Sequence, residues 1–255
     1  MMCLIIQYLK RAIGILKDKI LIVLAIYTIG LLLGLLLYFL RFLNWVYAGW
    51  GIKVQHWERF PKRQKRVLVV SNHPSLLEVV LVPALFFRDY ILHPFDFSPW
   101  NIPDKKNYFD RWYWAWAKIR LVPIDRENNR EAFKALRLIK KILNLGNIVI
   151  LFPEGGRTFK GEEFFYSEKG RKIRKLKAGV GWLVLKTNPL IVPVWIDGAE
   201  KVLPNKPDKL YHCLPNFCNC VTVKIGKPIN IQGKNKEEIT QEIVLSLLKL
   251  ADEEE

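Results

Sequence analysis

Short apolar runs alternate along most of the chain with longer segments of helical spacing. Uncharged, β-branched runs, which are typical of buried strands, lie at 67–70, 148–151 and 189–196. Helices are predicted at 130–145, 178–186 and 236–254. Because strands and helices alternate, we expect an α/β fold in which a largely parallel central sheet is flanked by helices.

The first forty residues follow a different pattern. Residues 20–40 contain no charged side chain, and these 21 residues are long enough to cross about 30 Å of hydrocarbon. Gly30 and Gly34 have a small-xxx-small spacing that lets helices approach closely. Residues 1–19 are apolar but interrupted by charges, which indicates an interfacial helix or half of a hairpin. We therefore expect a membrane-associated segment at 1–48, either a membrane-embedded helical hairpin or a single apolar helix. The α/β domain then comprises 49–255.

The chain is strongly basic. Its 255 residues carry 40 Lys and Arg against 24 Asp and Glu, a net charge of +16, while 51% are hydrophobic. This combination indicates an anionic membrane surface, an anionic substrate or nucleic acid as partner. The four cysteines show no paired framework, so we infer a reducing compartment. His212, Cys213, Cys218 and Cys220 match no defensible zinc spacing, and we expect no metal.

A polar turn follows the first predicted strand of the domain. In Ser71-Asn72-His73-Pro74-Ser75, the strand ends and a helix can begin at Pro74 or Ser75. Glu78 then lies in the first or second helical turn, within reach of one imidazole nitrogen of His73. The second nitrogen stays basic, as in a general base oriented by an acid. A pair that only satisfies its own hydrogen bonds is the alternative.

A second polar turn, Phe152-Pro153-Glu154-Gly155-Gly156-Arg157-Thr158, follows the strand at 148–151. Two strands that end in polar turns favour a site at the carboxyl edge of a sheet. The next segment, 159–177, is rich in Lys and Arg. It is either a solvated loop or a flap that attracts an anionic donor or lipid.

These motifs resemble those of the acyltransferases that esterify lysophosphatidic acid and related glycerol phosphates. The matching blocks are Asn72-His73 with an acid five residues after the histidine, the turn at 152–157, and Ile191-Val192-Pro193-Val194. Gly51-Ile52-Lys53-Val54 and Lys177-Ala178-Gly179 also fit, so the resemblance spans about 45–230 in the expected order.

The resemblance implies a role for each matching residue. His73 is the general base that takes the proton of the glycerol hydroxyl, and Glu78 stands where the family usually has Asp. Arg126 contacts the phosphate. The third block includes Glu154, Gly155 and Arg157, while its usual Thr and Ser are Gly156 and Thr158 here. Family members typically carry a helical hairpin embedded in the cytoplasmic leaflet. We therefore expect a membrane location, with the catalytic domain on the cytoplasmic face.

Physical chemistry agrees with this interpretation. A hydroxyl attacks a thioester at neutral pH only if a base removes its proton, and His73 suits that task. The predicted phosphate site comprises Arg126, Glu154, Gly155, Gly156, Arg157 and Lys177. In it, Arg126 and Arg157 bind the phosphate by bidentate hydrogen bonds, and the glycines let backbone N–H groups approach. No nucleophilic serine or cysteine pair is evident, so we expect direct transfer without an acyl-enzyme intermediate.

The predicted activity is acyl transfer from a thioester to the free hydroxyl of lysophosphatidic acid, which gives phosphatidic acid. It needs no cofactor, because acyl-CoA or acyl carrier protein is the co-substrate. The expected partners are an anionic phospholipid membrane, lysophosphatidic acid and the thioester donor, without nucleic acid. Acceptors such as glycerol 3-phosphate or another lysophospholipid are the first alternative. A non-catalytic basic protein that binds membranes or nucleic acid is the second.

Overall fold

A six-stranded sheet forms the centre of the protein in the computed structural model, which describes residues 2–105, 117–125, 128–203 and 216–254. The strands lie in the order β1-β8-β7-β2-β4-β3. Their bounds are β1 (Gly51–Gln55), β2 (Val67–Ser71), β3 (Trp100–Asn101), β4 (Ile148–Leu151), β7 (Leu190–Asp197) and β8 (Cys220–Ile225). Neighbouring strands are parallel except β7 and β8, which confirms a mostly parallel sheet.

Strand β2 lies between β4 and β7, and the three run in the same direction. Val70 of β2 is opposite both Leu151 of β4 and Pro193 of β7. The turns that follow β2 and β4 therefore emerge side by side at one edge of the sheet. This register places the two polar turns of the sequence next to each other.

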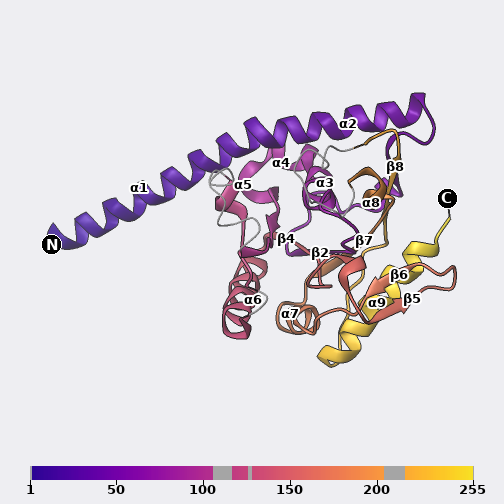
Figure 1. Ribbon diagram of the computed structural model, residues 1–255. Helices are drawn as coiled ribbons and strands as arrows, with labels where there is room; N and C mark the ends of the chain where they lie inside the picture. The colour runs from indigo at the N-terminus through magenta and orange to yellow at the C-terminus, as the bar shows by residue number, and fades with distance from the viewer. Residues whose placement is uncertain (1, 106–116, 126–127, 204–215, 255) are drawn as a thin grey trace.

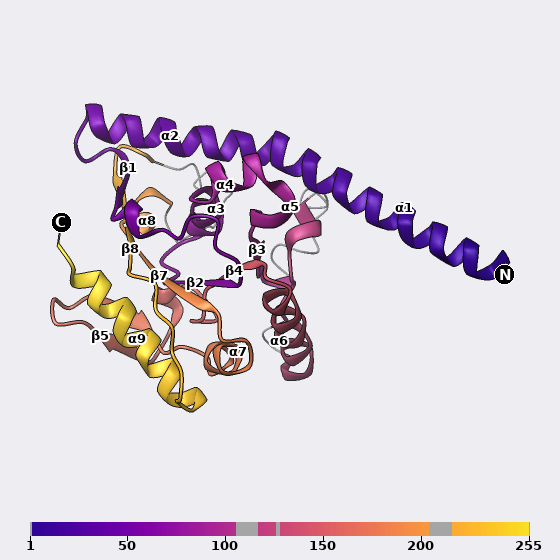
Figure 2. The same ribbon diagram turned by 180° about the vertical axis from the view of Figure 1, so that it is seen from behind.

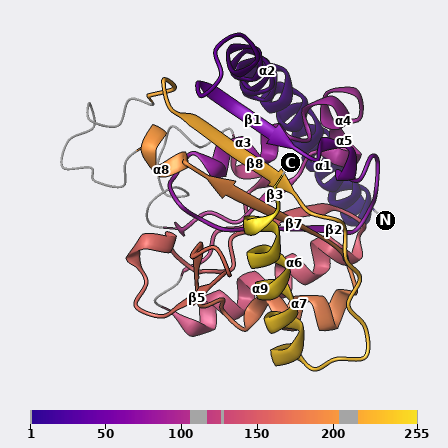
Figure 3. The same cartoon turned by 90° about the vertical axis from the view of Figure 1, so that its right-hand side faces the viewer.

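Helices cover both faces of the sheet (Figures 1 and 2). One layer contains α2 (Leu31–Val46), α3 (Glu78–Ala84), α4 (Phe87–Leu92), α5 (Pro94–Phe97) and α8 (Ala199–Val202). The opposite layer contains α6 (Asn129–Asn144), α7 (Gly179–Thr187) and α9 (Lys236–Asp252), and Figure 3 shows the strands between the two layers. Side chains of β2 alternate between two hydrophobic clusters: Val67 and Val69 face the α2 side, and Leu68 and Val70 face the other. The uncharged run in the sequence is thus a strand buried on both faces.

The predicted helices on the far face are confirmed within two residues at each end. The side chain of Asn128 caps α6 by accepting hydrogen bonds from two backbone N–H groups, and Asn235 forms a capping box with Glu238 at the start of α9. The helix after His73 begins at Glu78 instead of Pro74 or Ser75 and breaks before α4.

Two further segments carry local structure. Ala117–Arg120 is a 3₁₀ turn, and Leu121 and Ile124 after it form isolated bridges to Asn101 and Asp104. The basic segment at 159–177 contains a short antiparallel hairpin, β5 (Phe164–Tyr166) with β6 (Lys172–Arg174). The bridges join Leu121 and Ile124 to residues outside their own segment, whereas β5 and β6 pair within the basic segment itself.

The N-terminal segment forms one long helical rod. Helix α1 (Met2–Ala25) continues through a π-helical turn at Ile26–Gly30 into α2, and α1 extends beyond the rest of the protein (Figure 1). The chain does not reverse direction between these helices, so the hairpin alternative is wrong. Among the residues described, none of the helices is both long enough and apolar enough to span a bilayer.

Aromatic rings of α4 pack against Gly30 and Gly34 of this rod. A β-carbon on Gly34 would lie 2.0 Å from the ring of Phe87, and one on Gly30 would lie 3.0 Å from Tyr90. The Tyr90 hydroxyl also donates a 3.0 Å hydrogen bond to the Gly30 carbonyl. Packing within the chain therefore accounts for the small-xxx-small spacing.

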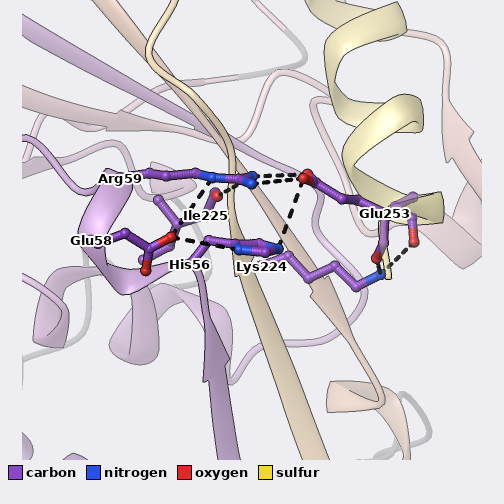
Figure 4. A network of polar contacts seen from close by, with 7 residues as sticks. His56, Glu58, Arg59, Lys224, Ile225 and Glu253 are labelled. Atoms are coloured by element: carbon purple, nitrogen blue, oxygen red, sulfur yellow. Dashed lines mark hydrogen bonds and ion pairs between the residues drawn. The ribbon is translucent and has the colours of Figure 1, made fainter. Parts of the chain in front are cut away.

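The C-terminal end of α9 is attached by polar contacts to β8 and to the 3₁₀ turn Trp57–Arg59 that follows β1 (Figure 4). The guanidinium of Arg59 donates two hydrogen bonds to the Glu253 carboxylate, at 2.9 and 2.7 Å. The Lys224 ammonium donates to the carbonyls of Ala251 and Glu253, at 2.7 and 2.6 Å. Lys224 satisfies carbonyl groups at the end of the helix, and both cations hold α9 on the sheet.

Candidate active site

His73 follows the last residues of β2 and contacts the carboxylate of Glu78. Nδ1 of the imidazole is hydrogen-bonded to Oε1 of Glu78. The same oxygen accepts a 2.8 Å hydrogen bond from the Ser75 N–H, so the bend at 74–77 fixes the acid as well. Both side chains are buried, with 7% of His73 and none of Glu78 exposed. The predicted pairing is present, and it orients one imidazole nitrogen while Nε2 makes no hydrogen bond to the described residues.

Asn72 locks the end of β2 to β7. Its side-chain amide donates a 2.8 Å hydrogen bond to the Ile196 carbonyl, and its oxygen accepts a 2.7 Å hydrogen bond from the Ile196 N–H. Asn72 is buried. The amide side chain extends the sheet pairing by one step where the backbone turns away, so His73 leaves the sheet at a fixed point.

Glu154 connects the two polar turns. Its Oε1 accepts hydrogen bonds from the His73 N–H at 2.7 Å and from the Thr158 hydroxyl at 2.8 Å, and its Oε2 accepts one from the Arg174 N–H at 3.0 Å. The carboxylate is fully buried. Burial raises the pKa of Glu154 to about 7, although these hydrogen bonds oppose the shift.

Glu154 therefore differs from its expected role. It was expected among the phosphate contacts, whereas its carboxylate lies inside the protein with three protein donors. A negative carboxylate would also repel a phosphate. Its position indicates that Glu154 holds the backbone of the site in place and does not contact the anionic substrate.

The glycine turn after Glu154 is bordered by two basic side chains. Gly155 has φ +68°, a backbone conformation that favours glycine. A β-carbon there would lie 3.1 Å from the stem of Lys177, and one on Gly156 would lie 2.7 Å from Nη1 of Arg174. The Lys177 N–H donates a 2.8 Å hydrogen bond to the Pro153 carbonyl, which holds the basic segment against the turn.

Arg157 is partly buried at the end of the same turn. The N–H of the next residue, Thr158, donates a 2.8 Å hydrogen bond to the His73 carbonyl. The turn that carries Arg157 is thus joined directly to the backbone of His73. Arg126 lies outside the described residues, as do His212 and Cys213.

The phenyl ring of Phe152 stacks on the imidazole of His73, with ring centroids 4.9 Å apart. Sequence reasoning did not single out this ring or Thr158, Ser75 and Asn72 as supports of the base. Asn72 has the clearest sequence signal, because a polar amide directly after a buried run must find partners. Arg174 was noted only as one charge of a basic segment.

Two surface hollows among the described residues lie elsewhere. One of about 870 Å³ lies between the β5–β6 hairpin and α9, and one of about 560 Å³ lies along α6 and Trp182. Neither is lined by His73 or by the glycine turn. The site is therefore defined by its hydrogen-bonded residues and not by either hollow.

A family model described as acyltransferase matches residues 51–197, which include both polar turns and the β7 block. The chain belongs to the acyltransferase family. The matched span contains His73, Glu78 and the turn at 152–158, so this acyltransferase has its paired histidine and acid within the family domain.

Several curated proteins resemble this acyltransferase. It is 25% identical over 187 residues to the chloroplastic 1-acyl-sn-glycerol-3-phosphate acyltransferase LPAT1 of Arabidopsis thaliana, covering 72% of this chain and 45% of that protein. It is 26% identical over 144 residues to the 1-acyl-sn-glycerol-3-phosphate acyltransferase of Helicobacter pylori, covering 56% and 54%. A probable enzyme of the same name in Mycoplasma pneumoniae is 30% identical over 150 residues, covering 58% and 50%. The chain thus spans about half the length of these relatives.

The fold is also similar to that of a solved structure. The crystal structure of the 1-acyl-sn-glycerophosphate (LPA) acyltransferase PlsC from Thermotoga maritima superposes with a TM-score of 0.56 at 20% identity. The match covers 84% of this chain and 77% of that one. This likeness supports the α/β architecture of the acyltransferase.

Proposed function

We propose that the chain transfers a fatty acyl group from a thioester to the free hydroxyl of lysophosphatidic acid, giving phosphatidic acid. The hydroxyl oxygen attacks the carbonyl carbon of the thioester while its proton passes to Nε2 of His73. The carbon–sulfur bond then breaks, and the thiolate takes the proton from His73 and leaves as a free thiol. No acyl-enzyme intermediate is needed.

The observation that carries this proposal is the buried His73–Glu78 pair at the carboxyl end of β2. Glu78 fixes the ring orientation and stabilises the imidazolium that forms when Nε2 takes the proton. The acceptor is suggested by the relatives, because their printed names specify 1-acyl-sn-glycerol-3-phosphate as substrate.

The phosphate of the acceptor would lie against the glycine turn. Arg157 and Lys177 are the described cations that the sequence placed there, and Arg126 belongs to the same predicted set. Charge-assisted hydrogen bonds from such groups bind phosphate strongly. Because Gly155 and Gly156 have no side chains, the phosphate could approach their backbone N–H groups closely.

Membrane association is the second part of the proposal. The outward face of α2 exposes a row of large apolar side chains, including Leu32, Leu35 and Phe39, while Leu37 and Leu40 on the opposite face are buried. We propose that this face lies in an anionic phospholipid surface. The free thiols of Cys218 and Cys220 fit a catalytic domain on the cytoplasmic face. The domain boundary at 48 and the choice between acyl-CoA and acyl carrier protein stay predictions.

An assay of the purified chain tests the function. We expect phosphatidic acid from lysophosphatidic acid with acyl-CoA or with acyl carrier protein, and a loss of at least about 1,000-fold in kcat for His73→Ala. Circular dichroism and the melting temperature check that the variant is folded. Full activity in folded His73→Ala would reject the mechanism. A panel with glycerol 3-phosphate and other lysophospholipids identifies the preferred acceptor.

A further inference from the structure

The side chain of Arg174 lies across two glycines beside the active site. A β-carbon on Gly156 would be 2.7 Å from Nη1 of Arg174, and one on Gly161 would be 2.6 Å from its Cδ. Such distances are too short for real β-carbons. The arginine side chain therefore occupies the space that side chains on these two positions would fill, its stem against Gly161 and the end of its guanidinium against Gly156.

Gly156 is also where this chain departs from the family motif. The resemblance gives Thr as the usual residue at this position of the third block, whereas here a guanidinium nitrogen lies 2.7 Å from the point where its β-carbon would be. The space beside the turn that a side chain would occupy is therefore filled by the guanidinium of Arg174, which comes from β6.

The backbone of Arg174 is tied to the general base. One carboxylate, that of Glu154, accepts the N–H of Arg174 at 3.0 Å and the N–H of His73 at 2.7 Å. Arg174 is partly buried, and among the described residues no carboxylate forms an ion pair with its guanidinium. Its neighbour Lys175, by contrast, is paired with Glu163 at 2.7 Å. A partly buried guanidinium without a counter-charge beside an active site is suited to an anionic ligand.

We propose that Arg174 determines acceptor specificity by binding the phosphate monoester of the acyl acceptor, together with Lys177 across the Gly155–Gly156 turn. The inference rests on the proposed function and adds a residue and a selectivity to it. A planar guanidinium can bind two phosphate oxygens at once, which favours a dianionic monoester over a zwitterionic or uncharged headgroup. Because Glu154 holds the backbone N–H groups of both Arg174 and His73, a phosphate bound by Arg174 has a fixed position relative to His73.

Steady-state kinetics of Arg174→Gln test this assignment. We expect the KM for lysophosphatidic acid to rise about 10- to 100-fold, because one charge-assisted contact is lost. The KM for the thioester donor and the kcat should change little. Selectivity for lysophosphatidic acid over monoacylglycerol, which lacks the phosphate, should fall by the same factor. Arg174→Lys keeps the charge and should recover part of the affinity.

Gly156→Thr provides an independent arm. Its new β-carbon displaces the Arg174 guanidinium, so we expect a similar rise in the KM for lysophosphatidic acid. Adding Gly156→Thr to Arg174→Gln should then cost little more, since both remove the same contact. Lys175→Gln is the matched control, because Lys175 directly follows Arg174 and its exposed charge is paired with Glu163. This variant should leave the KM for lysophosphatidic acid nearly unchanged.

Equilibrium binding of lysophosphatidic acid in detergent micelles separates this inference from the proposed function. If the wild type binds lysophosphatidic acid and Arg174→Gln binds it more weakly, the anion site stands even where turnover is absent. An unchanged KM and affinity in Arg174→Gln would overturn it. A rise confined to the donor KM would also overturn it and assign the cation to phosphates of the donor. An equal loss of kcat with both acceptors would reduce Arg174 to a structural residue.

Discussion

The backbone N–H of His73 donates a 2.7 Å hydrogen bond to the carboxylate of Glu154, 81 residues further along the chain. This bond joins the turn after β2 to the turn after β4. Through its other oxygen and through Thr158, the same carboxylate also holds β6 and the end of its own turn. The proposed base, His73, and the proposed phosphate site are therefore built around one buried acid.

Replacing Glu154 with Gln tests this connection. The amide has one acceptor oxygen instead of two, so at least one buried N–H loses its partner, and we expect a loss of about 1–3 kcal/mol in the free energy of unfolding. Urea titration followed by circular dichroism measures it. The exposed Glu163→Gln is the control and should change stability far less. An unchanged urea midpoint in Glu154→Gln would show that the hydrogen bonds of this carboxylate do not contribute to the free energy of unfolding.

The raised pKa of Glu154 predicts a pH dependence. Its pKa is about 7 in the folded protein against 4.5 in the unfolded chain, so the folded state holds the proton more tightly. The resulting stabilisation is complete below about pH 4.5 and declines as pH rises through 7, by about 3 kcal/mol at most. The difference in unfolding free energy between wild type and Glu154→Gln, measured from pH 4.5 to 8, should follow this curve. A difference independent of pH would contradict it.

The orienting acid makes a separate prediction. Glu78→Gln keeps the shape but removes the charge that stabilises the imidazolium, so we expect kcat to fall about 100- to 10,000-fold with little change in KM. Glu78→Asp keeps the charge but is one methylene shorter and cannot hold both His73 and the Ser75 N–H, so we expect a smaller loss. Rates at saturating lysophosphatidic acid measure both. Equal activity of Glu78→Gln and wild type would remove Glu78 from the mechanism.

Asn72 is expected to matter for stability and for activity. Asn72→Ala leaves the buried N–H and carbonyl of Ile196 without partners, which should lower the free energy of unfolding by about 2–4 kcal/mol. It also frees the residue directly before His73, so kcat should fall in the fraction that stays folded. Asn219→Ala is a suitable control, since Asn219 makes only an exposed contact at 3.5 Å. Similar melting temperatures for the two variants would show that the hydrogen bonds between Asn72 and Ile196 do not stabilise the protein.

The apolar face of α2 predicts binding to lipid vesicles. Replacing Leu32, Leu35 and Phe39 with Ser removes three outward side chains that are 64%, 55% and 55% exposed. Each contributes about 1.5–3 kcal/mol when buried in an apolar phase, so partition into anionic vesicles should fall at least about 100-fold. Sedimentation with vesicles measures the bound fraction.

Exposed leucines on the opposite layer provide the control for that experiment. Leu138, Leu145 and Leu245 are 46%, 71% and 56% exposed, and the same replacement by Ser there should leave vesicle binding unchanged. An equal loss from both sets would mean that general hydrophobicity, and not the face of α2, drives the binding.

The local sequence was sufficient for the strands and helices that depend on nearby residues. The uncharged β-branched runs became β2, β4 and β7 because a strand buried on both faces needs apolar side chains at every position. Asn128 and Asn235 cap α6 and α9 through hydrogen bonds to N–H groups within three residues, so these helix starts also depend on nearby residues. The pairing of His73 with Glu78 was predictable for the same reason, since five residues separate them.

Only the tertiary structure decided the features that join distant segments. The sequence pattern of α1 and α2 allowed a hairpin, and the packing of Gly30 and Gly34 against α4 is compatible with the straight rod that is observed. Glu154 looked like part of a phosphate site until its three donors, supplied by three separate segments, placed it in the interior. Arg174 gained its importance from Gly156 and Gly161 for the same reason. A buried polar group takes its role from whichever partners the folded chain brings to it, and those partners have no fixed spacing in the sequence.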